Sequence, residues 1–116
     1  MGNKVTKPWG TYEVLKTDDI FQTKEIVIFP DQAPSYQMHY KRKEIWMVTQ
    51  GNGILRQNDI LKDVNVGDVI YIDYKDKHQL KNTGKENLIF IEIQIGSYFG
   101  EDDIVRLEDL YGRTKT

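Results

Sequence analysis

The sequence predicts an all-β protein, an antiparallel jelly-roll barrel with a short C-terminal helix. Three observations support this prediction. Short runs rich in β-branched and aromatic residues alternate with turn residues, which is typical of sandwiches and barrels. Helical spacing occurs in one stretch only, near the end of the chain. The 116 residues amount to one domain of ordinary size, so we expect residues 1–116 to form a single domain.

Residues that favour turns separate the expected strands. Proline cannot donate a hydrogen bond to a sheet, so the 30–34 segment ends one strand. Glycines at 51 and 53 end another, and Asn58-Asp59 fits a tight hairpin. The predicted strands are 11–15, 21–29, 35–40, 44–50, 54–57, 60–63, 69–72, 78–82 and 88–95.

The 88–95 strand shows the most regular alternation of side chains. One face carries only isoleucine, and we expect it to be core: Ile89, Ile91, Ile93 and Ile95. The other face is mixed, and we expect it to line a cavity that is apolar at one end and polar at the other: Leu88, Phe90, Glu92 and Gln94.

The helical spacing lies after Glu101, where Ile104, Leu107 and Leu110 recur every three residues. Acidic residues precede them, and acids at a helix start interact favourably with its dipole. We therefore expect a short helix in this segment.

The composition excludes several classes of partner. A net charge of −2 gives no basis for binding nucleic acid or a membrane surface, and no apolar run is long enough to span a bilayer. We expect a cytoplasmic protein. Because there is no cysteine, any metal must be held by nitrogen and oxygen ligands.

Candidate ligands of that kind occur close together. Gln37 and His39 leave the same face of one predicted strand, and Glu44 opens the next. Each taken alone is better explained as a surface or core residue. A buried glutamate needs a partner, however, and Glu44 shares its face with the apolar Trp46. We predict that His78, the only other histidine, completes a metal site with these three residues.

The spacing of these residues is specific. Four residues separate His39 from Glu44, and six separate Glu44 from Gly51. Ten separate Gly67 from His78. This pattern resembles the two-part signature of the cupin superfamily, whose fold is a double-stranded β-helix. Gln37 stands where cupins usually carry the first histidine of a His-x-His pair.

Longer segments narrow the resemblance to one family. The segments 7–14, 37–39, 91–98 and 100–113 are similar to the type II mannose-6-phosphate isomerase domain, and the likeness extends over residues 7–113. In that family the domain is commonly the C-terminal half of a bifunctional enzyme that also has mannose-1-phosphate guanylyltransferase activity.

The resemblance implies a metal site and a reaction. Gln37, His39, Glu44 and His78 would hold a divalent metal ion. This ligand set suits Zn²⁺ best, with Mn²⁺, Co²⁺, Fe²⁺ or Ni²⁺ as alternatives. The implied reaction is an aldose–ketose isomerisation that converts mannose 6-phosphate to fructose 6-phosphate. It needs a Lewis acid, an acid–base group and cations for the phosphate.

Other residues are candidates for these remaining roles. Glu92 on the mixed face is the candidate acid–base group, and a solvated edge position is its alternative. Arg106 and Lys77, followed by Arg113, are the candidates for holding the sugar phosphate. The alternatives are a salt bridge from Arg106 to a nearby acid and a solvated loop position for Lys77. We assign the basic 41–43 segment to a solvated turn.

Several positions differ from the residues that are usual in the family, and these differences leave two other functions as alternatives. Residues that are usually arginine, histidine or glutamate in the family are replaced by Ala33, Tyr40, Lys41 and Ile45. One alternative is a non-catalytic cupin that binds a sugar phosphate or sugar nucleotide in polysaccharide metabolism. Another is an isomerase or epimerase of nucleotide-linked sugars, although the metal-free cupins of that kind lack this ligand set. By analogy with other cupins we expect a homodimer.

Overall fold

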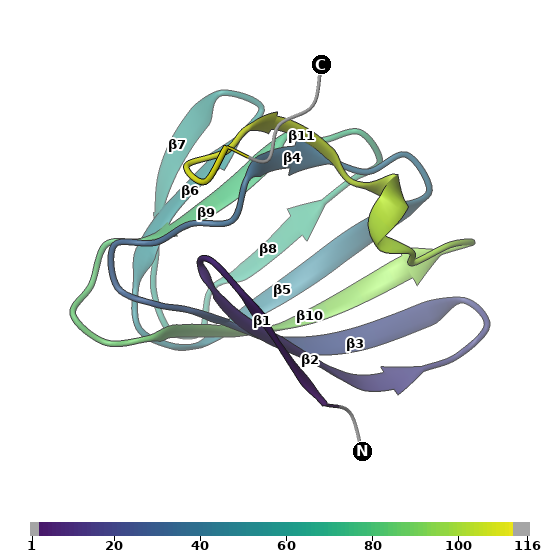
Figure 1. Cartoon of the computed structure of the whole chain (residues 1–116), viewed down its shortest axis with the longest axis horizontal. Coiled ribbons are helices and arrows are strands. Elements are labelled where there is room, and N and C mark those ends of the chain that lie inside the picture. Colours follow the sequence, from purple (N-terminus) through teal and green to yellow (C-terminus); the bar gives the residue numbers. More distant parts are fainter. Residues whose placement is uncertain (1–2, 113–116) are drawn as a thin grey trace.

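The computed structural model describes residues 3–112, which fold into two antiparallel sheets on opposite sides of a barrel (Figure 1). One sheet has six strands, in the spatial order β1 (Lys4–Lys7), β2 (Gly10–Thr17), β3 (Phe21–Ile28), β10 (Leu88–Gly96), β5 (Arg42–Gln50) and β8 (Val69–Ile72). The other has five, in the order β11 (Val105–Glu108), β4 (Tyr36–Met38), β9 (His78–Asn82), β6 (Gly53–Gln57) and β7 (Ile60–Val64).

All nine predicted strands are present, and each end lies within two residues of its predicted position. The predicted hairpin at Asn58-Asp59 joins β6 to β7, and both of its turn residues have positive φ angles. The sequence did not reveal β1, because its residues are mostly exposed and show no apolar alternation. Pairing with β2 through a register from Lys4↔Glu13 to Lys7↔Gly10 makes this segment a strand.

The all-β prediction is confirmed, but the C-terminal helix is wrong beyond one turn. Residues Glu101–Asp103 form a single 3₁₀ turn (η1), and the residues after it form the strand β11. This strand pairs with β4, placing Val105 opposite Met38 and Arg106 opposite Gln37. An edge strand has unpaired backbone groups. Pairing with β11 satisfies the backbone groups of β4, and this gain outweighs the preference for a helix that the spacing of three apolar residues indicates.

The interior lies between the two sheets. Aromatic and aliphatic side chains from both sheets fill it, and most are almost fully buried: Ile28, Trp46, Val48, Leu55, Val64, Ile72, Leu80, Leu88 and Phe90. Burying this apolar surface provides the main stabilisation of the fold. No helix within residues 3–112 has the length and apolar character needed to cross a membrane.

The structure buries the opposite face of β10 from the one that the sequence predicted to be core. The mixed face of Leu88, Phe90, Glu92 and Gln94 is buried inside the barrel, and the four isoleucines are only half-buried on its outside. The reason is the register with β5, which places Phe90 opposite Val48 and Glu92 opposite Trp46. Phe90 and Glu92 of the mixed face line the cavity as predicted, whereas Leu88 and Gln94 are buried away from it and the isoleucine face is not core.

Candidate functional site

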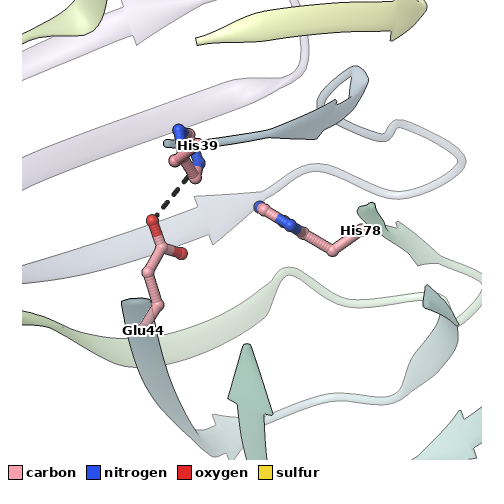
Figure 2. Close-up of side chains that lie close together, drawn as sticks. All are labelled: His39, Glu44 and His78. Carbon is pink, nitrogen blue, oxygen red and sulfur yellow. Dashed lines mark ion pairs between the residues drawn. The ribbon is translucent and has the colours of Figure 1, made fainter. Parts of the chain in front are cut away.

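Three of the predicted metal ligands converge inside the barrel. His39 follows β4, Glu44 lies in β5 and His78 begins β9, and Figure 2 shows their side chains directed toward one another. One ligand atom from each lies within 4.8 Å of the other two. All three residues are buried, with 2–3% of their surface exposed. A compact, buried group of two imidazoles and one carboxylate is a typical metal-binding arrangement.

Backbone carbonyl groups orient both histidine rings. The Nδ1 atom of His39 lies 3.1 Å from the carbonyl oxygen of Asp103, and that of His78 lies 2.8 Å from the carbonyl oxygen of Asp76. A carbonyl oxygen only accepts hydrogen bonds, so each Nδ1 carries a proton and donates it. The Nε2 atom of each ring then carries no proton, which is the state that binds a metal ion.

Glu44 is held by two donors from its own strand. Its Oε1 accepts a hydrogen bond from Trp46 Nε1 at 2.9 Å, and its Oε2 accepts one from Arg42 Nε at 2.8 Å. Burial raises the pKa of Glu44, but interaction with His39 and Arg42 outweighs burial and lowers the pKa to about 2; of these two groups, only the Arg42 guanidinium is charged at neutral pH. Glu44 is therefore an ionised ligand at neutral pH.

The histidines are neutral at the same pH. Burial, which disfavours the charged imidazolium, lowers the pKa of His39 to about 4 and also lowers the pKa of His78. A metal ion binds only a deprotonated imidazole nitrogen. Both rings are thus in the state that a metal requires.

Arg42 belongs to the site, although the sequence placed it in a solvated turn. Only 3% of its surface is exposed, and its Nη2 lies 3.3 Å from His39 Nε2. The available signal was the alternation of β5, because a residue two positions before Glu44 shares its face. Arg42 touches two predicted ligands, so metal binding requires this guanidinium to move away from His39 and Glu44.

Gln37 completes the predicted ligand set. It lies opposite His78 in the pairing of β4 with β9 and lines the same cavity. Its Nε2 donates to the carbonyl oxygen of Ser35 at 3.3 Å. The donor set of two imidazole nitrogens, one carboxylate and one amide oxygen fits a divalent ion such as Zn²⁺.

The metal ligands form one end of a larger cavity. Glu92 lines it from β10, and Arg106 lines it from β11. Ser35 also lines it, and the buried hydroxyl oxygen of this residue has no hydrogen-bond partner among the described residues. Buried polar atoms are rarely left unpaired, so the unpaired hydroxyl indicates a place for a polar ligand.

Glu92 is buried with 7% of its surface exposed. Burial, followed by repulsion from Glu44, raises the pKa of Glu92 to about 8. Its Oε2 accepts a hydrogen bond from Gln94, which is in turn bonded to Gln22. A carboxyl group that is held in place and titrates near neutral pH is suited to acid–base chemistry.

The structure does not bring the predicted Lys77 into this cavity. Lys77 Nζ lies 3.2 Å from Asp59 on the hairpin between β6 and β7, in an exposed position. Arg113 lies outside the described residues. Sequence reasoning missed Lys7 and Lys24, which do line the cavity. The signal for Lys24 was its position in alternation with Ile26 and Ile28, which are buried.

Comparisons with known proteins identify the family of the chain. The sequence matches the family described as "Mannose-6-phosphate isomerase C-terminal" over residues 1–109. The xanthan biosynthesis protein XanB of Xanthomonas campestris pv. campestris (strain B100) is 44% identical over 111 residues, which cover 96% of this chain and 24% of XanB. The mannose-1-phosphate guanylyltransferase ManC of Salmonella typhimurium (strain LT2) is 40% identical over 113 residues, which cover 97% of this chain and 24% of ManC. The chain spans about a quarter of the length of these curated relatives.

Solved structures share the fold at lower identity. The capsular polysaccharide assembling protein CapF of Staphylococcus aureus has a TM-score of 0.77 at 20% identity, over 93% of this chain and 32% of CapF. A double-stranded β-helix protein from Klebsiella pneumoniae has a TM-score of 0.75 at 20% identity, over 83% of this chain and 84% of that one. These similarities confirm the double-stranded β-helix, or cupin, fold. Because the family match extends over residues 1–109, the chain belongs to the mannose-6-phosphate isomerase C-terminal family.

Proposed function

We propose that this chain is a metal-dependent sugar-phosphate isomerase that interconverts mannose 6-phosphate and fructose 6-phosphate. The observation that carries the proposal is the placement of the His39–Glu44–His78 cluster and the acid–base candidate Glu92 in one cavity. Membership of the family supports the same reaction. The relatives are proteins of polysaccharide biosynthesis or sugar-nucleotide formation by name, so a role in carbohydrate metabolism is part of the proposal.

Gln37, His39, Glu44 and His78 would hold the metal ion. Such an ion, when bound, supplies a Lewis acid for the carbonyl oxygen of an open-chain sugar. The protein's own contribution is to keep the rings neutral by burial and to orient them through the carbonyl groups of Asp103 and Asp76. Zn²⁺ is the proposed metal, with Mn²⁺, Co²⁺, Fe²⁺ and Ni²⁺ as alternatives.

Glu92 would move the proton between the two neighbouring carbons. Isomerisation requires one group that takes a proton from one carbon and returns it to the next. With its pKa raised to about 8, Glu92 has both protonation states accessible near neutral pH. Burial next to Trp46 and Phe90 also shields the transferred proton from water.

A coupled assay with mannose 6-phosphate tests the proposal. The full chain is loaded with Zn²⁺, Mn²⁺ or Co²⁺, and fructose 6-phosphate formation is followed. We expect turnover that is lost on chelation and in His39→Ala, and kept in Lys62→Ala, whose side chain is exposed on β7. The absence of turnover with every metal, in a protein that is folded and has bound the metal, would refute the isomerase.

The second candidate is a non-catalytic cupin that binds a sugar phosphate or sugar nucleotide. One observation favours it, the contact of the Arg42 guanidinium with two of the predicted ligands. An arginine in that position already compensates the buried Glu44 without a metal ion. Saturable binding of mannose 6-phosphate without conversion would support this candidate. The cytoplasmic location and the homodimer also stay predictions.

A further inference from the structure

We propose that Lys24 and Lys7 form the subsite for the anionic group of the ligand, and that Glu101 fills this subsite in the ligand-free protein. The proposal is based on the position of Glu101, whose two carboxylate oxygens face the ammonium groups of Lys7 and Lys24 at the cavity. The inference rests on the proposed function for the identity of the ligand, a sugar that carries a phosphate.

Lys24 is a buried cation that is incompletely paired. Its side chain is 6% exposed, and its Nζ lies 3.7 Å from Glu101 Oε2, which is longer than a hydrogen bond. The same Nζ lies 4.4 Å from the centre of the Tyr12 ring. Removing an ammonium group from water is costly unless it is paired and hydrogen-bonded. The environment of Lys24 therefore favours an additional anion.

Glu101 shows the shape of the ligand that fits there. One of its carboxylate oxygens lies 3.9 Å from Lys7 Nζ, and the other is the oxygen that faces Lys24. Its side chain is 43% exposed and belongs to the single 3₁₀ turn η1, so it can leave this position at small cost. A phosphate group has several oxygens at similar spacing and more negative charge, and it would replace the carboxylate between the two lysines.

Three other basic side chains already have closer partners. Arg42 donates to Glu44 at 2.8 Å, Lys77 pairs with Asp59 at 3.2 Å, and Arg56 pairs with Glu108 at 3.1 Å. Among these residues only Arg42 lines the cavity, and it lies at the metal-ligand end. Arg106 lines the cavity from the opposite sheet and could assist the two lysines.

The position of Lys24 also matches the substrate. In a hexose 6-phosphate the carbonyl group and the phosphate lie at opposite ends of the carbon chain. Lys24 and Glu44 lie on β3 and β5, which flank β10 on either side. Two strand spacings separate them, about 10 Å across the sheet. Glu92 lies in the strand between them, directly opposite Lys24 in register. A sugar chain could therefore extend from the metal ligands past Glu92 to the two lysines.

Binding measurements on the metal-loaded full chain test the subsite. Calorimetric titrations measure the affinity for mannose 6-phosphate, inorganic phosphate and mannose. The proteins compared are wild type, Lys24→Met, Lys7→Met and Glu101→Gln. Lys62→Met, whose side chain is exposed on β7, is the control. We expect Lys24→Met to weaken binding of both phosphate ligands by about 10-fold or more, the size of a lost charge-assisted contact. Lys7→Met should weaken it less, because Lys7 is more exposed. Glu101→Gln should tighten it several-fold, and mannose should be unaffected throughout.

Two results would overturn the subsite: equal binding of phosphate ligands by wild type and Lys24→Met, or weaker binding after Glu101→Gln. If Lys24→Met does not fold, the surface variants decide the question, because Lys7→Met should weaken phosphate binding and Glu101→Gln should tighten it. Phosphate binding through these lysines without turnover would leave the subsite standing and refute the isomerase. If the folded Lys24→Met, or both Lys7→Met and Glu101→Gln, turn over substrate with an unchanged KM, the subsite is refuted and the isomerase is kept.

Discussion

The two faces of β10 differ in a way that their composition does not suggest. The outer face carries four isoleucines, yet these are only half-buried. The inner face carries Glu92 and Gln94, and both are buried, with Glu92 lining the cavity. Sheet neighbours decide this orientation, because Trp46 and Val48 of β5 lie opposite the inner residues and face the second sheet. A polar residue on a core strand thus marks a site, whereas an apolar row on the same strand does not by itself mark the core.

The largest expected effect is on activity at the inner face. Glu92→Gln keeps the size and hydrogen-bonding capacity of the side chain but cannot transfer a proton, so we expect turnover to fall by about 10²–10⁴-fold. Ile93→Val on the outer face of the same strand is the matched control and should retain full turnover. Steady-state rates with metal-loaded protein measure both. Similar rates for wild type and Glu92→Gln would remove Glu92 from the mechanism.

The second expected effect is on stability. Phe90→Ala empties part of the core beside Trp46 and should cost about 3–5 kcal/mol in the free energy of unfolding. Ile91→Ala on the outer face should cost about 1 kcal/mol, because its side chain is only half-buried. Urea titrations of the two variants provide the comparison. An equal cost at the two positions would contradict the assigned orientation of the strand.

The third expected effect is a pH dependence of stability that arises from Glu92 on the inner face. The pKa of Glu92 is raised from 4.5 to about 8 in the folded protein. Between these values the unfolded chain releases a proton that the folded chain keeps, so rising pH favours unfolding. Wild type should therefore lose stability relative to Glu92→Gln from pH 4.5 up to about pH 8. Urea midpoints measured across this range in metal-free protein give the difference, and parallel curves would rule out the raised pKa.

The smallest expected effect concerns the outer face and the expected homodimer. Ile91 of β10 lies opposite the exposed Met47 of β5, which in turn lies opposite the exposed Val69 of β8, and this apolar surface is suited to contact with a second copy. Ile93→Lys should convert a dimer to a monomer while changing turnover little. Light scattering measures the mass of both proteins. A wild-type mass of one chain would refute the homodimer, and an unchanged dimer in the variant would place its contact elsewhere.

Three residues of the candidate metal site could be predicted from short-range patterns, and His78 was added as the only other histidine. Alternation places Gln37 and His39 on one strand face, and the spacing to Glu44 resembles a known signature. The convergence of His39, Glu44 and His78 in the structure agrees with this prediction. The cations of the cavity were harder to predict. Arg42 and Lys24 resemble solvated charges when each is taken alone, and their alternation with inward residues becomes decisive only once the pairing of their strands fixes which face is buried.

The sequence by itself determined nine of the strands, the turns between them and the candidate metal ligands. These properties depend on side-chain type and on contacts between near neighbours. Only the tertiary structure decided which face of β10 is buried, that residues 105–108 form a strand, and that Lys24 rather than Lys77 lies at the cavity. The physical reason is that each of these outcomes depends on pairing with a strand far away in the chain. Period-two alternation identifies the two faces of a strand, but only its sheet neighbours determine which of them faces the core.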